Sequence, residues 1–243
     1  MALKVLVVGP LSPIGGVSRF VQTLLNKKIP GVNFLHFDIS ASREPRALRM
    51  LKAVLGFVCS LVSIRPDCVH YVWQSMSGTP RDVALVRIAK LMGYRIIIDV
   101  RGGNIGDWIE HAERKGFMSR LVRDTLSLGS AVILQSSRLV EICTKELLSP
   151  LVCLPNTIPS SLVIPPYEVR QCAKTIAYAG HIIPEKGIAT LLQALQWLYE
   201  KDSELKLMLI GRLEDLGLGA EIESAKGVEY TPEMDRQSLL NNL

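Results

Sequence analysis

The stretch AYAGHIIPEKGIATLLQAL, residues 177–195, has the pattern of a strand, a loop and a helix. Apolar residues run up to Gly180, and apolar residues at helical spacing begin after Gly187. A strand–loop–helix unit is the building block of an open α/β sheet, where ligands bind beyond the carboxyl ends of the strands. Lys186 stands in this loop, and its role depends on what the rest of the chain forms.

The same alternation of strand and helix patterns runs through the first part of the chain. Val/Ile/Leu runs separated by segments with 3.6-residue spacing predict parallel strands covered by helices on both faces. The predicted strands are 3–8, 33–37, 68–72, 95–99, 131–135 and 151–154, and the predicted helices are 17–26, 46–63, 82–92 and 137–148. We therefore predict an α/β fold with a doubly wound parallel sheet.

A proline-rich segment interrupts the alternation after residue 155. Proline fixes φ and removes a donor, so this segment is predicted to be a connection. The predicted organisation is a Rossmann-like domain over 1–155, a linker over 156–174 and an incomplete second Rossmann-like domain over 175–243. The second domain is predicted to hold strands 175–179, 205–210 and 228–230, helices 187–201 and 215–225, and a helix start at residue 233.

The net charge and the cysteine content limit which cellular compartment and which kinds of binding partner the chain can have. The net charge of +5 is compatible with an anionic partner, but the basic residues are scattered and not clustered with aromatic residues, which argues against nucleic acid. The five cysteines show no Cys-x-x-Cys spacing, as is typical of unpaired thiols in a reducing compartment. Pro10 comes too early for a signal peptide. We expect a cytoplasmic protein.

The most apolar stretch is MLKAVLGFVCSLVSI, residues 50–64. It is shorter than a membrane-spanning helix and contains Lys52, so we interpret it as a buried helix. The alternative is a peripheral contact with an anionic membrane at the inner membrane face.

Two glycine pairs follow predicted strands. Gly15 and Gly16 stand where the first helix is predicted to begin, and glycine there lets a phosphate approach the N–H groups of the helix end. The alternative is a tight turn of an ordinary α/β unit. The spacing matches neither G-x-G-x-x-G nor the P-loop pattern. The second pair, Gly102 and Gly103, belongs to the segment IIIDVRGGNIGDW, residues 96–108.

Asp99 and Arg101 stand at the carboxyl end of the fourth predicted strand, where α/β sheets bind ligands. Arg101 has the geometry to hold a phosphate or a carboxylate through two parallel hydrogen bonds. The alternatives are a helix cap for Asp99 and a surface ion pair for Arg101. The histidines do not cluster, so no metal site is predicted, and His36 and His70 are expected to be hydrogen-bonded core residues.

Six fragments in a fixed order carry a family resemblance. They are GPLSPIGGVSRF (9–20), RPDCVHYVW (65–73), LPNTIP (154–159), AYAGHIIPEKGIATLLQAL (177–195), LKLMLIGR (205–212) and EYTPEMDRQSLL (229–240). Together they resemble the retaining glycosyltransferases of family 4, which have the GT-B fold, and the resemblance covers essentially the whole chain. It implies transfer of a sugar from a nucleotide-sugar donor to a glycan, lipid-linked or polysaccharide acceptor, with no metal and no further cofactor.

The resemblance also implies roles for individual residues. Two domains face each other across a cleft, with the donor diphosphate held by Lys186 and His181 and approached by the Gly15–Gly16 loop. Asp99 and Arg101 are the predicted catalytic residues, and Gly102 and Gly103 line the acceptor side. A cation beside the diphosphate offsets the negative charge that develops on the leaving group.

The sequence also departs from the family. His181 replaces the usual arginine, and a histidine is charged only when protonated. Arg101 replaces the usual histidine, and the family's paired acids after a later strand are absent. We expect a C-terminally truncated chain that is inactive alone. The alternative functions are a degenerate non-catalytic partner protein, or another GT-B enzyme such as a sugar-nucleotide epimerase.

Overall fold

The structure is a computed structural model that divides the chain into two compact units, Met1–Ile158 and Pro159–Leu243. It describes residues 2–12, 15–40, 44–74, 79–102, 105–110, 116–156, 174–213 and 215–232. Each unit is described by itself. The predicted linker over 156–174 lies almost wholly outside the described residues, as does the predicted helix start at residue 233. The predicted domain boundaries therefore stay a prediction.

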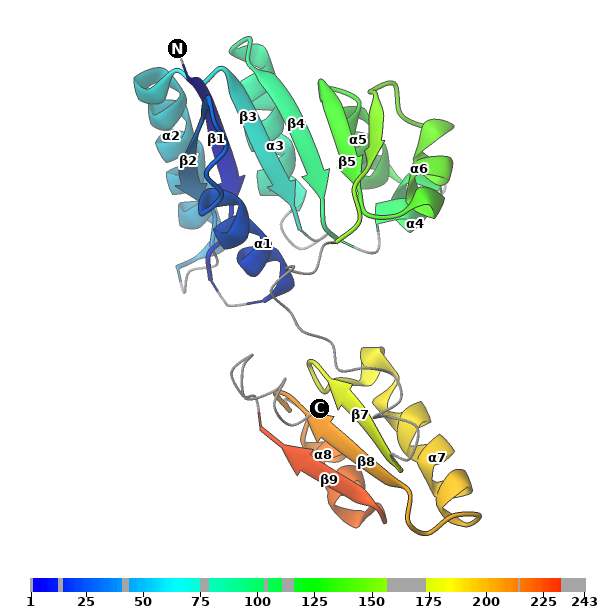
Figure 1. Cartoon of the computed structure of the whole chain (residues 1–243). Helices are drawn as coiled ribbons and strands as arrows, with labels where there is room; N and C mark the ends of the chain where they lie inside the picture. The colour runs from blue at the N-terminus through cyan, green and yellow to red at the C-terminus, as the bar shows by residue number, and fades with distance from the viewer. Residues whose placement is uncertain are drawn as a thin grey trace. The chain divides into compact units, whose positions relative to one another are not determined.

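Unit 1 is built on a parallel sheet with the strand order β2-β1-β3-β4-β5-β6 (Figure 1). Every strand pair in it is parallel, which confirms the predicted doubly wound sheet. The strands are β1 (Leu3–Gly9), β2 (Val32–Asp38), β3 (Cys68–Trp73), β4 (Arg95–Val100), β5 (Ala131–Leu134) and β6 (Leu151–Cys153).

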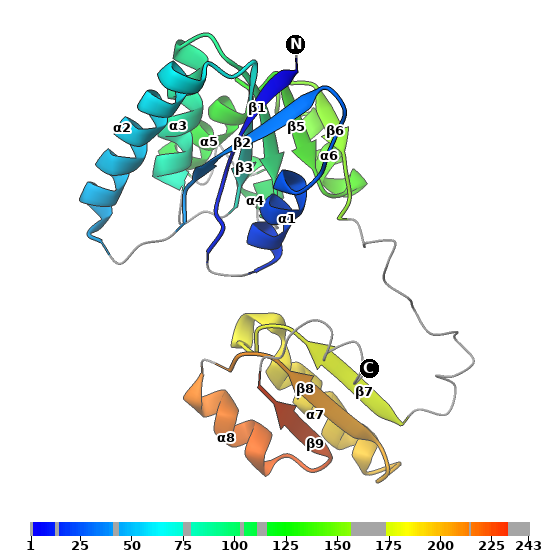
Figure 2. The ribbon, with the colours of Figure 1, turned by 60° about the vertical axis from the view of Figure 1, so that its left-hand side comes forward.

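Helices cover both faces of this sheet. Helix α1 lies on one face, while α2, α3 and α5 lie on the other, and α4 and α6 lie beside β5 and β6 (Figures 1 and 2). The helices are α1 (Gly16–Leu25), α2 (Arg46–Ile64), α3 (Thr79–Leu91), α4 (Ile105–Glu110), α5 (Phe117–Leu126) and α6 (Ser137–Thr144). The core residues on the α2 and α3 side include Leu6, Tyr71 and Ile98, all completely buried.

Two helices of unit 1 have no counterpart in the sequence prediction. Helix α4 is only six residues long, which is too short to show helical periodicity. Helix α5 buries the polar residues Ser119 and Thr125 together with Val122 and Leu126, while Phe117 is exposed, so its apolar pattern marks only part of the buried face.

Helix α2 corrects the expectation of a buried helix. Phe57 and Leu61 are its fully buried residues, and most of its other side chains are exposed or half-buried. Its 19 residues and its mean hydropathy of 1.8 would allow it to cross a membrane, by length and composition alone. The apolar stretch 50–64 considered in the sequence analysis is therefore part of a longer helix.

Unit 2 has a smaller parallel sheet with the order β7-β8-β9 (Figure 2). Its elements are β7 (Thr175–Ala179), the 3₁₀ turn η3 (Pro184–Lys186), α7 (Ile188–Tyr199), β8 (Lys206–Ile210), α8 (Leu216–Ser224) and β9 (Val228–Thr231). Ile182, Ile188 and Leu207 lie in its core with no exposed surface. The predicted strand–helix alternation is confirmed over these residues.

Candidate functional site

The first group of candidate residues lies where β3 and β4 end. Side chains two residues apart on an extended chain point to the same side, which brings Asp99 and Arg101 together. The Arg101 Nε donates to Oδ1 of Asp99 at 2.6 Å, and Nη2 donates to Oδ2 at 2.9 Å. The Asp99 side chain is completely buried and that of Arg101 is 3% exposed. The two predicted catalytic residues therefore form a buried ion pair.

The remaining surface of the Arg101 guanidinium also has partners. Nη1 donates to Oδ1 of Asn156 at 2.8 Å, and the guanidinium carbon lies 3.7 Å from the ring centroid of Phe20. Phe20 belongs to α1, and Asn156 follows β6. Arg101 is thus neither the surface ion pair considered above nor an exposed anion ligand, because its donors bind protein groups.

His70 completes this network from the middle of β3. Its Nε2 lies 3.1 Å from Oδ2 of Asp99, and its ring lies 6.5 Å from that of Phe20. The side chain is 12% exposed. The prediction that His70 is a hydrogen-bonded core residue is confirmed, but the sequence did not indicate its partner, which is 29 residues away. A histidine held by a carboxylate is the arrangement that proton transfer uses, so His70 joins the candidate site.

The electrostatics of Asp99 favour its charged form. Burial on its own raises the pKa of this carboxyl, but hydrogen bonds from His70 and Arg101 and the charge of Arg101 act against it. The pKa of Asp99 is lowered overall. Asp99 is therefore a fixed anion that orients His70 and Arg101.

Gly15 and Gly16, at the end of the loop after β1, border open space, and their role in ligand approach stays a prediction. Gly15 is the N-cap of α1, with its N–H donating to Ser18 Oγ at 2.7 Å, and Gly16 is the first helical residue. A Cβ added at either glycine would meet nothing within 4 Å. Packing in unit 1 therefore does not require these two glycines.

Side chains after β2 hold the start of this loop. The N–H groups of Leu11 and Ser12 donate to Oγ of Ser40 at 3.0 and 2.9 Å, and Ser40 in turn donates to Oδ1 of Asp38 at 2.6 Å. Gly102 is half-buried directly after Arg101, and Gly103 lies outside the described residues.

The second group of candidate residues follows β7 in unit 2. Ile182 is buried and donates its N–H to the carbonyl of Arg212 at 2.9 Å, while the neighbouring His181 is exposed. Lys186 is exposed at the end of η3, directly before Gly187, the N-cap of α7 with φ of 74°. The predicted place of Lys186, beside the start of the first helix of unit 2, is confirmed.

The backbones after β7 and β8 meet at two glycines. A Cβ added at Gly211, whose φ is 149°, would lie 1.8 Å from the carbonyl oxygen of Gly180. Tyr178 and Tyr230 flank this contact, donating from their hydroxyl groups to the carbonyls of His181 at 2.9 Å and Gly211 at 3.1 Å. The contact fixes the loop that carries His181.

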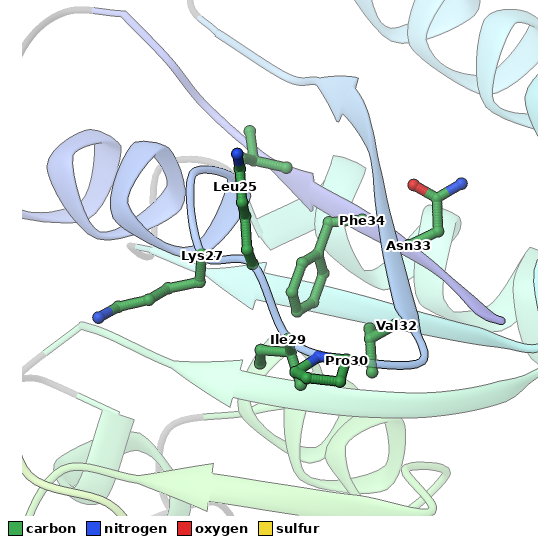
Figure 3. A pocket seen from close by; sticks show the side chains of 8 residues that line it. Leu25, Lys27, Ile29, Pro30, Val32, Asn33 and Phe34 are labelled. Carbon is green, nitrogen blue, oxygen red and sulfur yellow. The ribbon is translucent and has the colours of Figure 1, made fainter.

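The part of the chain that the structure describes contains no cluster of three or more His, Cys, Asp or Glu residues that could hold a metal ion. A pocket of about 390 Å³ lies between the end of α1 and the start of β2 (Figure 3). Leu25, Lys27, Pro30 and Phe34 are among its lining residues. Because parallel strands share their direction, this pocket is at the opposite end of the sheet from Asp99.

No family model matches the sequence, and no curated relative does either. Solved structures do match. A UDP-N-acetylglucosamine 2-epimerase has a TM-score of 0.62 at 11% identity, over 99% of this chain and 72% of that one. The S. aureus MnaA–UDP structure has a TM-score of 0.59 at 12% identity, over 100% and 72%. The E. coli trehalose-6-phosphate structure bound with UDP-2-fluoro glucose has a TM-score of 0.62 at 11% identity, over 97% and 75%.

These likenesses show an α/β fold of the GT-B type, as predicted. Within unit 1 the structure brings Asp99 and Arg101 together, and within unit 2 it places His181 and Lys186 on one connection. Whether the two groups face a common cleft stays a prediction.

Proposed function

We propose that the chain is a GT-B glycosyltransferase resembling family 4, which moves a sugar from a nucleotide-sugar donor to a glycan, lipid-linked or polysaccharide acceptor with retention. The observation that carries the proposal is the pair of exposed basic side chains, His181 and Lys186, at the carboxyl end of β7 beside the start of α7. The solved structures with this fold that hold UDP or UDP-2-fluoro glucose support a nucleotide-sugar donor.

The donor diphosphate is assigned to unit 2. A helix start carries partial positive charge and N–H donors, and Lys186 adds a full positive charge there. This charge stabilises the leaving diphosphate as the sugar bond breaks, which is the task that a metal ion performs in other transferases. The proposed reaction is therefore metal-independent and takes place in the cytoplasm, where the unpaired cysteines stay reduced.

The acceptor is assigned to unit 1. The open loop at Gly15 and Gly16 and the chain that begins at Gly102 form its proposed surroundings. Asp99 and Arg101 bind each other, so in this proposal they hold the end of β4 in place, and His70 is the nearby group able to exchange a proton.

A sugar-nucleotide epimerase is the second candidate. The buried pair of His70 and Asp99 favours it, because an epimerase needs proton-transfer groups, and a UDP-N-acetylglucosamine 2-epimerase shares the fold. A non-catalytic partner protein is the third, favoured by the complete pairing of Arg101.

One incubation series separates the three candidates. The purified chain is mixed with UDP-, GDP- and ADP-sugars, with or without simple glycosides as acceptors and with or without EDTA, and the sugars are followed by proton NMR. A glycoside product with the donor's anomeric configuration supports the proposal. A new sugar nucleotide formed without acceptor identifies an epimerase. Donor binding with no product in any mixture supports the non-catalytic candidate only for this chain by itself, since a truncated transferase is also expected to be inactive alone. A lower yield with EDTA than without it contradicts a metal-independent reaction.

A further inference from the structure

Helix α2 has a second apolar face that the described residues of unit 1 leave exposed. Leu48, Leu51, Leu55 and Val62 are 43%, 55%, 57% and 55% exposed, and Cys59 is exposed between them. At 3.6 residues per turn these five positions fall within one arc of about 80°. They form a continuous stripe along the helix, which we call the α2 stripe.

The opposite side of α2 is anchored in the core. Phe57 and Leu61 are completely buried, and the Phe57 ring lies 5.4 Å from that of Phe37 on β2. The carbonyl of Leu61 accepts a hydrogen bond from the hydroxyl of Tyr94 at 2.8 Å. Because α2 connects β2 to β3 and packs on their sheet, it cannot cross a bilayer without leaving the core.

The charges of α2 have one sign. Arg46, Arg49 and Lys52 occupy its first half, and residues 46–64 contain no aspartate or glutamate. Lys52 borders the α2 stripe, is 59% exposed and pairs with Glu44 just before the helix. Of the three cations only Lys52 borders the stripe, because Arg46 falls about 180° from the centre of the stripe at 3.6 residues per turn. A basic side chain at the edge of an apolar stripe complements an anionic surface.

The area of the α2 stripe argues against a second copy of the chain as its partner. The helix is about 28 Å long and the stripe about 10 Å wide, which gives about 300 Å². A stable protein interface needs roughly 800 Å² on each side. A stripe without acidic residues also offers no counter-charge to the cations of a second α2.

We propose that α2 is an interfacial helix that docks unit 1 on an anionic lipid surface. The leucines and Val62 of the α2 stripe enter the boundary between headgroups and acyl chains, and Lys52 pairs with a lipid phosphate. Helices with a strong apolar face and a basic border bind membranes in this way, through buried apolar area and attraction to anionic lipid. The inference does not depend on the enzymatic activity of the chain.

Flotation of the full chain with vesicles tests the proposal. Vesicles of equal parts phosphatidylglycerol and phosphatidylcholine should carry the chain upward in a density gradient, and pure phosphatidylcholine vesicles should carry much less. Added salt should weaken the binding, because it screens the attraction. The double variant Leu51→Ser/Leu55→Ser should lower the partition coefficient about tenfold. Lys52→Gln should lower it about fivefold, for the anionic vesicles alone.

The matched control is Leu91→Ser/Leu148→Ser, which removes two leucines that are 87% and 93% exposed but lie outside α2. This variant should float like the unchanged chain, and circular dichroism should show that every variant is folded. Failure of the unchanged chain to float, or equal flotation of all variants, would overturn the proposal. A dimer in sedimentation velocity that Leu51→Ser/Leu55→Ser dissolves, together with no vesicle binding, would also overturn it in favour of a second copy.

Discussion

Arg101 and Asp99 form two parallel hydrogen bonds, of 2.6 and 2.9 Å, inside unit 1. The same guanidinium binds Asn156 and stacks on Phe20. This one side chain therefore connects the end of β4, the exit of β6 and helix α1. Its removal affects all three.

Arg101→Ala should lower the free energy of unfolding of unit 1 by about 3–5 kcal/mol, because it leaves the buried Asp99 carboxylate without its main counter-charge. Urea unfolding monitored by circular dichroism measures the change. The control is Lys52→Ala, which removes an exposed pairing with Glu44 in the same unit and should cost at most about 1 kcal/mol. Equal costs for the two variants would contradict a structural role of the buried pair.

The lowered pKa of Asp99 predicts a loss of stability in acid. A carboxyl whose pKa is lower in the folded than in the unfolded state stabilises the fold above the unfolded value of about 3.9, and this contribution disappears as the pH falls through the folded value. The gap in unfolding free energy between the unchanged chain and Asp99→Asn should therefore be largest near neutral pH and close below about pH 4. Asp82, whose pKa is raised by burial, acts in the opposite direction and is present in both proteins. A gap that stays constant with pH would refute this account.

Gly211→Ala should destabilise unit 2 by about 3 kcal/mol, because the new methyl group overlaps the carbonyl of Gly180 and the sheet has to shift. Gly187→Ala is the matched control in the same unit. The methyl group added at Gly187 meets no atom within 4 Å, so the substitution costs only the strain of the positive φ, about 1 kcal/mol. Hydrogen exchange of the β7 and β8 peptides, measured by mass spectrometry, reports the destabilisation caused by each of the two substitutions. Similar exchange in the two variants would show that the glycine contact is not tight.

Lys186→Ala should weaken binding of UDP roughly tenfold to hundredfold, through loss of a charge-assisted hydrogen bond of about 1.5–3 kcal/mol. Ligand-observed NMR suits the weak affinities expected. Lys226→Ala removes the same charge from an exposed residue just before β9, at the other end of the unit 2 sheet, and should leave UDP binding unchanged. If both variants bind alike, Lys186 is an ordinary surface lysine.

His181→Arg should strengthen UDP binding about tenfold at neutral pH. Arginine is always charged and holds phosphate through two hydrogen bonds, whereas histidine is charged only when protonated. His181 is exposed, so the longer side chain has room. A weaker complex would place the diphosphate elsewhere.

The fold was largely predictable because its strands are buried on both faces and read as unbroken apolar runs, as in β1 and β4. The errors in the sequence prediction of the helices have local physical causes. Helix α5 buries serine and threonine, which carry no apolar signal, and α2 exposes leucines that a sequence pattern assigns to the core.

The site was predictable only in part. The two-residue spacing of Asp99 and Arg101 places both side chains on one side of the strand, and that spacing alone could have indicated their pairing. His70 and Asn156 could not be assigned, because the β3–β4 register and the path of the chain after β6 bring them to Asp99 and Arg101. His181 and Lys186 are exposed, and in the proposed function their partner groups belong to a ligand, which no sequence pattern in this chain identifies.

Asn156 gives the Arg101 network a mechanical consequence. It is the last described residue of unit 1, and its side-chain oxygen accepts from both Arg101 Nη1 at 2.8 Å and Gln135 Nε2 at 3.0 Å. The chain therefore leaves unit 1 from a clamped position, and its direction of departure is set by the interior of the sheet. A force applied along the connection would therefore have to break these two side-chain hydrogen bonds as well as the pairing of β6 with β5 before the outer strand could peel away.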